Sequence, residues 1–254
     1  MWRVFCASAT GQRNLEQGAP GQDASHYIVM EDVLVAVVCD GAGSVCEGRT
    51  GSDFIARALA EELANAVHAD PSLCEVRAVG QARLEATIRC AIGAVRARLE
   101  ELAASRQLVL HDFSCTLVGC VASPRSGCFF QIGDGFAIQQ AANGDSALSH
   151  PENGEYADET YFVTDENWKD HLRHTPLPAP EAGTVIGLMS DGTAPFAVNR
   201  ARSGFFRPFI DPIVAFLRES TAANGNAALR NLLESPRACE ISSDDKTLLL
   251  ALVL

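Results

Sequence analysis

The stretch Val33-Leu34-Val35-Ala36-Val37-Val38-Cys39-Asp40-Gly41-Ala42-Gly43-Ser44 is an apolar run that ends in a carboxylate and two glycines. The run is long enough for a core strand, rich in β-branched residues and short for a helix. Gly41 and Gly43 end it and let the backbone approach a ligand closely. Because Asp-Gly is also a common turn signal, this stretch alone predicts a buried strand that delivers Asp40 either to a site or merely to a turn.

The same pattern, an apolar strand with a carboxylate at its end, recurs along the chain. Scattered turn aspartates have no reason to lie so regularly against buried strands. Four such strand ends can meet at one edge of a core, so the sequence predicts a shared cation site there. The further places are Asp191-Gly192 after residues 184–190, Asp134 between Gly133 and Gly135 within a strand pair, and Asp244-Asp245 before the run 248–254.

Length and composition indicate one domain. A chain of 254 residues that is 47% hydrophobic can bury a full core, and no break in composition separates the apolar runs. We therefore expect a single domain over residues 1–254. Residues 143–158 are too polar for a core and are expected to form a surface insertion near the substrate groove, where loops vary and choose partners.

The net charge of −12 argues against binding to nucleic acid or an anionic membrane, since both require basic patches. The N-terminal ten residues lack the long apolar core of a signal peptide, and no stretch approaches the roughly 20 apolar residues that span a bilayer. A cytoplasmic protein is expected. The nine cysteines are scattered and form no Cys-x-x-Cys pair, which indicates reduced core residues rather than a zinc site.

The hydrophobic pattern predicts an antiparallel α+β domain. Runs 26–30 and 33–39 flank Glu31-Asp32 as a hairpin, and apolar steps of three and four residues predict helices over 49–69 and 79–104. Strands joined by short turns, with helices gathered in pairs, argue against a parallel βαβ fold. The remaining expected elements are a meander of strands 113–122, 127–133 and 136–141, strands 2–10, 161–164, 184–190 and 246–254, and helices 207–220 and 226–233.

A cluster of carboxylates at strand ends is self-repelling unless a cation neutralises it. Oxygen ligands without His or Cys suit Mg²⁺ or Mn²⁺ rather than zinc or copper. Two such ions about 3.5–4 Å apart can activate a shared water and clamp the attacking and leaving oxygens of a phosphoryl transfer. The reaction that this site predicts is hydrolysis of a phosphate ester.

Six motifs in order resemble the metal-dependent serine/threonine protein phosphatases of type 2C, and within that family its bacterial branch. Six motifs in the family's order and approximate spacing are far more specific than any one of them. The resemblance spans nearly the whole chain and implies a sandwich of two antiparallel sheets flanked by helix pairs, an αββα arrangement. The motifs are Gln22-Asp23-Ala24, Asp40-Gly41-Ala42-Gly43-Ser44, Thr116-Leu117-Val118 with Gly133-Asp134, Gly154-Glu155-Tyr156-Ala157-Asp158-Glu159-Thr160, Ser190-Asp191-Gly192 and Asp244-Asp245-Lys246-Thr247.

The resemblance also implies roles for individual residues. Asp40 would bridge two metal ions, and the backbone carbonyl of Gly41 would be a ligand of one of them. Asp191 and Asp244 would complete the other ion's ligands, which makes these two and Asp40 the catalytic residues. Asp134 resembles the family's ligand for a weaker third metal. Asp23, next to Gln22, would lie behind the ligands and orient water.

Several positions depart from the family pattern. Gln22 replaces the usual Glu, as is common in the bacterial branch, and removes one negative charge. Ala42 replaces a His proposed to protonate the leaving alcohol, and Pro195 replaces an acidic residue four positions beyond Asp191. No Arg aligns cleanly as the phosphate-binding residue. Arg13 is the nearest candidate for this role. The alternative interpretation is that Arg13 is an ordinary arginine in a solvated loop.

The function expected from the sequence is a protein phosphatase that hydrolyses phosphoserine and phosphothreonine and opposes a Ser/Thr kinase. The departures at Gln22, Ala42 and Pro195 motivate an alternative, a non-catalytic phosphoprotein-binding regulatory module on the same fold. The retained carboxylates favour the catalyst, since a module has no need of a repelling cluster. A third hypothesis is a small-molecule phosphoesterase with the same site. Only a test of substrates distinguishes it from the protein phosphatase.

Overall fold

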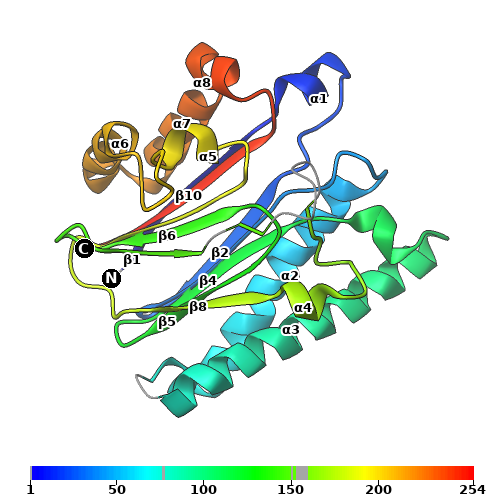
Figure 1. The fold of residues 1–254 in the computed structure, drawn as a ribbon, viewed down its shortest axis with the longest axis horizontal. Helices are drawn as coiled ribbons and strands as arrows, with labels where there is room; N and C mark the ends of the chain where they lie inside the picture. Colours follow the sequence, from blue (N-terminus) through cyan, green and yellow to red (C-terminus); the bar gives the residue numbers. More distant parts are fainter. Residues whose placement is uncertain (1, 76–77, 150, 153–159) are drawn as a thin grey trace.

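The computed structural model describes residues 2–75, 78–149, 151–152 and 160–254. Within them the chain forms two antiparallel sheets of five strands that face each other, with helices on both outer faces (Figure 1). The first sheet has the order β1 (Trp2–Ala9), β10 (Lys246–Val253), β9 (Val185–Met189), β6 (Phe136–Gln140), β7 (Ser146–Ser149). The second has the order β2 (Ala24–Met30), β3 (Val33–Cys39), β4 (Leu117–Ala122), β5 (Gly127–Ile132), β8 (Arg173–Leu177). The predicted α+β sandwich is confirmed.

Strand β3 shows why its sequence is an unbroken apolar run. Val35 and Val37 pack in the cluster formed with the helices, whereas Leu34, Ala36 and Val38 pack between the two sheets. A strand that is buried on both faces has no solvent-facing positions at which polar residues would alternate.

Two groups of helices close the outer faces. Helices α2 (Gly48–Ala69) and α3 (Ala78–Ser105) cover the second sheet, and α6 (Arg207–Glu219), α7 (Ala222–Leu233) and α8 (Pro236–Ile241) cover the first (Figure 1). Short helices lie in the connections: α1 (Gln12–Glu16), α4 (Trp168–His171), α5 (Ala194–Ala197) and the 3₁₀ turns η1 (Pro71–Cys74) and η2 (Leu110–Phe113). None of the described helices is long and apolar enough to cross a membrane.

Most predicted elements are present within one to four residues of their expected ends, and the β2–β3 hairpin turns at Glu31 in the left-handed region (φ 50°). The predicted three-strand meander is wrong. Strands β4 and β5 pair, but β6 leaves their sheet and pairs with β9 and β7 in the other one. Gly133, with φ of 96°, makes this change of direction possible, so Asp134 lies where the chain crosses from one sheet to the other.

Two further expectations are corrected. Residues 161–164 form no strand, and the chain there continues through turns to α4. Residues 143–158 are not a continuous loop, because Ser146–Ser149 form strand β7 paired with β6. The remainder of that insertion includes residues 150 and 153–158, which lie outside the described part of the chain, as does most of the Gly154–Thr160 motif.

Candidate metal centre

A pocket of about 310 Å³ opens where the two sheets meet near the ends of β3, β9 and β10. Asp40 follows β3, Asp191 follows β9, Asp244 precedes β10, and Asp134 lies between β5 and β6. All four carboxylates line this one pocket, together with Gly41. The fold therefore brings together the four strand ends that the sequence predicted to meet.

Close packing of loops brings the acidic strand ends together. A side chain at position 192 would collide with the backbone oxygen of Asp245, so only Gly192 lets the loop after β9 approach the start of β10 this closely. On the other sheet, the Asp40 backbone N–H donates to the Thr116 hydroxyl at 3.1 Å, and the Thr116 N–H donates to the Asp40 carbonyl at 2.8 Å. These bonds fix the direction in which Asp40 leaves β3.

Asp23 lies behind the pocket and does not line it. Its carboxylate is 2% exposed and accepts a hydrogen bond from the Ser190 hydroxyl at 2.6 Å. Ser190 in turn accepts the Thr247 backbone N–H at 2.9 Å, so Asp23 is tied to the start of β10. Burial raises the pKa of Asp23 to about 7 even though the Ser190 bond lowers it. Asp23 thus lies behind the carboxylates that line the pocket, and its role in orienting water stays a prediction.

Burial and mutual repulsion raise the pKa values of three lining carboxylates, Asp40, Asp134 and Asp191. Burial raises the pKa of Asp191 to about 6, and the charges of Asp134 and Asp244 add to this shift. The pKa of Asp40 is raised well above its usual range by burial and then by the charges of Asp23 and Asp191. Burial also raises the pKa of Asp134. These carboxylates need a neutralising partner at neutral pH.

The donor set fits a hard divalent cation. One carboxylate oxygen of Asp191, Oδ1, is buried and has no hydrogen-bond partner within the described chain. Among the described residues, no group of three or more acidic, histidine or cysteine side chains is arranged to hold a metal ion by itself. Mg²⁺ fits such a site because it keeps several waters and binds through one or two carboxylates rather than in an all-protein cage.

Asp245 has a structural role that the motif did not reveal. Its buried carboxylate accepts the backbone N–H groups of Gly11 at 2.6 Å and Gln22 at 2.5 Å, and the Asn14 amide at 2.8 Å. It thereby holds the segment between β1 and β2 at the rim of the pocket. The signal in the sequence is a pair of adjacent acidic residues directly before a strand. Side chains of neighbouring residues in an extended segment point in opposite directions, so the two carboxylates meet different partners.

Lys246 was also not singled out from the sequence. Its side chain is fully buried, and its ammonium donates to the Asp244 carbonyl at 2.7 Å. This bond fixes the backbone that carries Asp244. The signal in the sequence is a lysine between two aspartates and an apolar run, because lysine at the start of a core strand is rarely buried without a partner.

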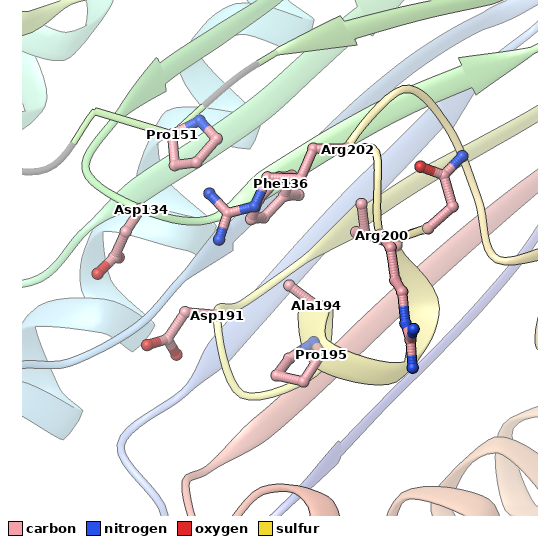
Figure 2. Close-up of a pocket in the computed structure, with 10 residues that line it drawn as sticks. Asp134, Phe136, Pro151, Asp191, Ala194, Pro195, Arg200 and Arg202 are labelled. Atoms are coloured by element: carbon pink, nitrogen blue, oxygen red, sulfur yellow. The ribbon is translucent and has the colours of Figure 1, made fainter.

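The remaining predicted positions lie around the pocket. Arg13, on α1, and Gln22 and Ala42 line it, and Arg13 is exposed. The Gln22 side-chain amide donates to the Ala42 carbonyl at 3.4 Å. Pro195 lines an adjoining pocket that contains Asp134 and Asp191 (Figure 2).

Comparison with known proteins agrees with this fold. The family model described as Protein phosphatase 2C matches residues 10–234. Serine/threonine-protein phosphatase 3 of Escherichia coli (strain K12) is 29% identical over 261 residues, which cover 99% of this chain and 98% of that protein.

Solved structures share the fold at low sequence identity. A bacterial serine phosphatase has a TM-score of 0.66 at 19% identity, with 100% of this chain and 97% of that chain covered. The S. agalactiae serine/threonine phosphatase has a TM-score of 0.66 at 14% identity, with both chains fully covered at 100%. RsbX in complex with magnesium has a TM-score of 0.58 at 13% identity, with 98% of this chain and 94% of that chain covered. The chain therefore belongs to the protein phosphatase 2C family of serine/threonine protein phosphatases.

Proposed function

We propose that this protein phosphatase acts through two divalent cations, Mn²⁺ or Mg²⁺, held in the pocket between its sheets. The observation that carries the proposal is the meeting of Asp40, Asp134, Asp191 and Asp244 from four separate chain segments around one pocket. The raised pKa values of Asp40, Asp134 and Asp191 and the unpartnered Asp191 Oδ1 describe a cluster that lacks positive charge. The family is metal-dependent, and oxygen donors suit these ions.

Each residue has a distinct part in this proposal. Asp40 and the Gly41 carbonyl would hold ions on the side of the second sheet, and Asp191 and Asp244 on the side of the first. Asp134, at the crossing between sheets, would hold a weaker third ion. Such cations supply activation of a water nucleophile and neutralisation of charge on the phosphoryl oxygens.

The surrounding side chains position the reacting groups. Asp23, held by Ser190, would orient water from behind the ligands. Arg13 is free to reach a phosphoryl group from the exposed rim, where its guanidinium can donate two parallel hydrogen bonds. Ala42 offers no proton donor, so protonation of the leaving alcohol falls to water. The phosphoprotein substrate would be made by a Ser/Thr kinase, which completes a reversible modification cycle.

Substitution of Asp191 by Asn tests this proposal. Asp191→Asn keeps the side chain's shape but removes a charge from a proposed ligand, so kcat on a phosphothreonine peptide should fall by at least about a hundredfold. The control is Asp211→Asn, which removes one charge from an exposed ion pair with Arg207 on α6. Activity should require Mn²⁺ or Mg²⁺ and disappear with EDTA.

The alternative functions give different outcomes in the same assay. Equal activity of wild type and Asp191→Asn would remove Asp191 from the mechanism. No hydrolysis by the wild type at saturating Mn²⁺ would favour the non-catalytic binding module. Hydrolysis of small phosphate esters without activity on any phosphopeptide would favour the small-molecule phosphoesterase.

A further inference from the structure

A second pocket adjoins the carboxylate pocket and shares two of its aspartates. Its volume is about 430 Å³, and its lining includes Asp134 and Asp191 as well as Arg200 and Arg202 (Figure 2). The two pockets thus meet at Asp134 and Asp191. A peptide whose phosphoryl group occupies the carboxylate pocket would therefore place neighbouring residues in the second one.

A tight hairpin holds Arg202 in a fixed position. The Arg202 backbone N–H donates to the Asn199 carbonyl at 2.9 Å, and the Asn199 N–H donates to the Gly204 carbonyl at 3.0 Å. The Asn199 side chain accepts the Ser203 N–H at 3.0 Å. Arg202 itself has φ of 51°, a left-handed conformation that is uncommon for a residue with a side chain. The backbone of this exposed arginine is thus defined by its loop.

The Arg202 side chain extends over Phe136 toward the end of the pocket that contains Asp134, whereas Arg200 extends in another direction (Figure 2). The guanidinium carbon of Arg202 lies 5.5 Å from the centre of the Phe136 ring, within cation–π distance. A guanidinium that packs on a ring through one face keeps the N–H donors at its edge available for hydrogen bonds. Arg202 is therefore directed toward a ligand in the pocket.

Arg202, like Arg200 and most other arginines of the described chain, has no acidic partner. Arg83, Arg106, Arg173 and Arg207 each form an ion pair. Across residues 2–75, 78–149, 151–152 and 160–254, no carboxylate pairs with Arg202 and no side-chain hydrogen bond occupies its guanidinium. An exposed guanidinium without an acidic partner, at a pocket that adjoins the carboxylate pocket, can bind an anion even in a chain of net charge −12.

We propose that Arg202 forms a specificity subsite for a second anionic group of the phosphoprotein substrate, a carboxylate or a further phosphate near the residue being dephosphorylated. This inference depends on the proposed function, because it places the scissile phosphoryl group at the adjoining carboxylates. A guanidinium suits this task, since its planar edge donates two parallel hydrogen bonds to either anion. Arg200, at the same pocket, adds positive potential.

The test uses peptides in which one residue near a phosphothreonine is varied. At each of three positions on either side, the neighbour is Ala, Asp or phosphoserine. For the wild type with Mn²⁺, we expect Asp at one or more positions to raise kcat/KM about tenfold over Ala, mainly through KM. The peptides with phosphoserine distinguish the two anions. If the preference over Ala is larger for phosphoserine than for Asp, the subsite binds phosphate. If it is equal or smaller, the subsite binds carboxylate.

The matched variants are Arg202→Gln, Arg202→Lys and Arg207→Gln. The ratio of kcat/KM between the Asp and Ala peptides is compared within each variant, so a change in overall activity cancels. In Arg202→Gln the ratio should fall to within twofold of one, and in Arg202→Lys it should be intermediate because charge is kept without the planar fork. Arg207→Gln removes an exposed arginine outside the pocket and should keep the full ratio.

The proposal is overturned if the wild type shows no preference at any position, or if Arg202→Gln keeps it. Wild-type hydrolysis of p-nitrophenyl phosphate with Mn²⁺ reports separately on the proposed function. If the wild type hydrolysed neither p-nitrophenyl phosphate nor any peptide, the proposed function would be wrong. The subsite would then be tested by the Kd values of the peptides. Fluorescence anisotropy of the same labelled peptides should then show the same tenfold preference and its loss in Arg202→Gln, and equal Kd values would overturn the subsite.

Discussion

Asp23 couples the stability of the protein to pH. It is 2% exposed, and burial raises its pKa to about 7 from an ordinary value of 3.8. Between these two pH values the folded, metal-free protein binds more protons than the unfolded chain. Its free energy of unfolding therefore falls as pH rises across this window.

We expect the melting temperature of the protein in EDTA to decrease from pH 5 to pH 7.5. Asp23→Asn should flatten this decrease, because the amide cannot ionise and can still accept the Ser190 hydrogen bond. The measurement is a thermal melt of both proteins at several pH values, with Asp211→Asn as the control for loss of one exposed carboxylate. Parallel curves for wild type and Asp23→Asn would show that Asp23 is not responsible.

Elements with a clear periodicity were predicted well. Helices α2 and α3 each bury a stripe of residues at three- and four-residue steps, and β3 is apolar because both of its faces are buried. The pairing of β6 with β9 was not predictable from periodicity. Alternation shows that residues 136–140 form a strand, but it carries no information on which sheet the strand joins.

Two edge strands, β7 and β8, were missed for a related reason. Strand β8 contains Arg173, His174 and Pro176, and it pairs on one side only, with β5. Polar residues and proline are tolerated at an edge, where they remove the local strand signal. At the site, strand-end aspartates were visible in the sequence, whereas Arg202 belongs to a loop whose approach to Phe136 depends on the tertiary fold.

Helix α2 contains a glycine that the packing requires, and α3 contains one that it does not. A side chain at Gly51 would collide with the backbone oxygen of Phe113. At Gly93 the nearest atom to an added side chain is in Trp168, at 3.9 Å, which is an ordinary contact. Intrinsic helix propensity favours Ala over Gly by about 1 kcal/mol at both positions.

The two Gly→Ala substitutions should thus have opposite effects. Gly93→Ala should raise the free energy of unfolding by up to about 1 kcal/mol. Gly51→Ala should lower it by about 1–3 kcal/mol, because α2 must move away from η2. Urea denaturation of the two variants and the wild type measures both. Stabilisation by Gly51→Ala would contradict the close approach of α2 to Phe113.

At the scale of the whole molecule, the proposed metal ions join the two sheets. Asp40 follows a strand of the second sheet, while Asp191 follows and Asp244 precedes a strand of the first. The sheets also share an apolar core that includes Leu34, Val38 and Leu249. We therefore propose that the chain unfolds as one domain and that metal binding stabilises both sheets together.

Saturating Mn²⁺ should raise the melting temperature in a single transition. At a free concentration of about 100 times Kd, one bound ligand adds about 2.7 kcal/mol to the free energy of unfolding. For a chain of this size, about 2–4 °C per kcal/mol corresponds to a rise of roughly 5–10 °C. KCl at matched ionic strength is the control, because salt alone screens the repulsion within a chain of net charge −12.

Calorimetry decides whether the sheets respond together. One transition, with equal calorimetric and van't Hoff enthalpies, is expected with and without Mn²⁺. The shift should reverse with EDTA and shrink in Asp191→Asn, since a ligand stabilises the native state only as far as it binds it. The contrary outcome is two separate transitions, of which Mn²⁺ shifts only one. The ions would then be bound by residues of a single sheet, and both the prediction of one domain and the proposed joining of the sheets by the carboxylates would be wrong.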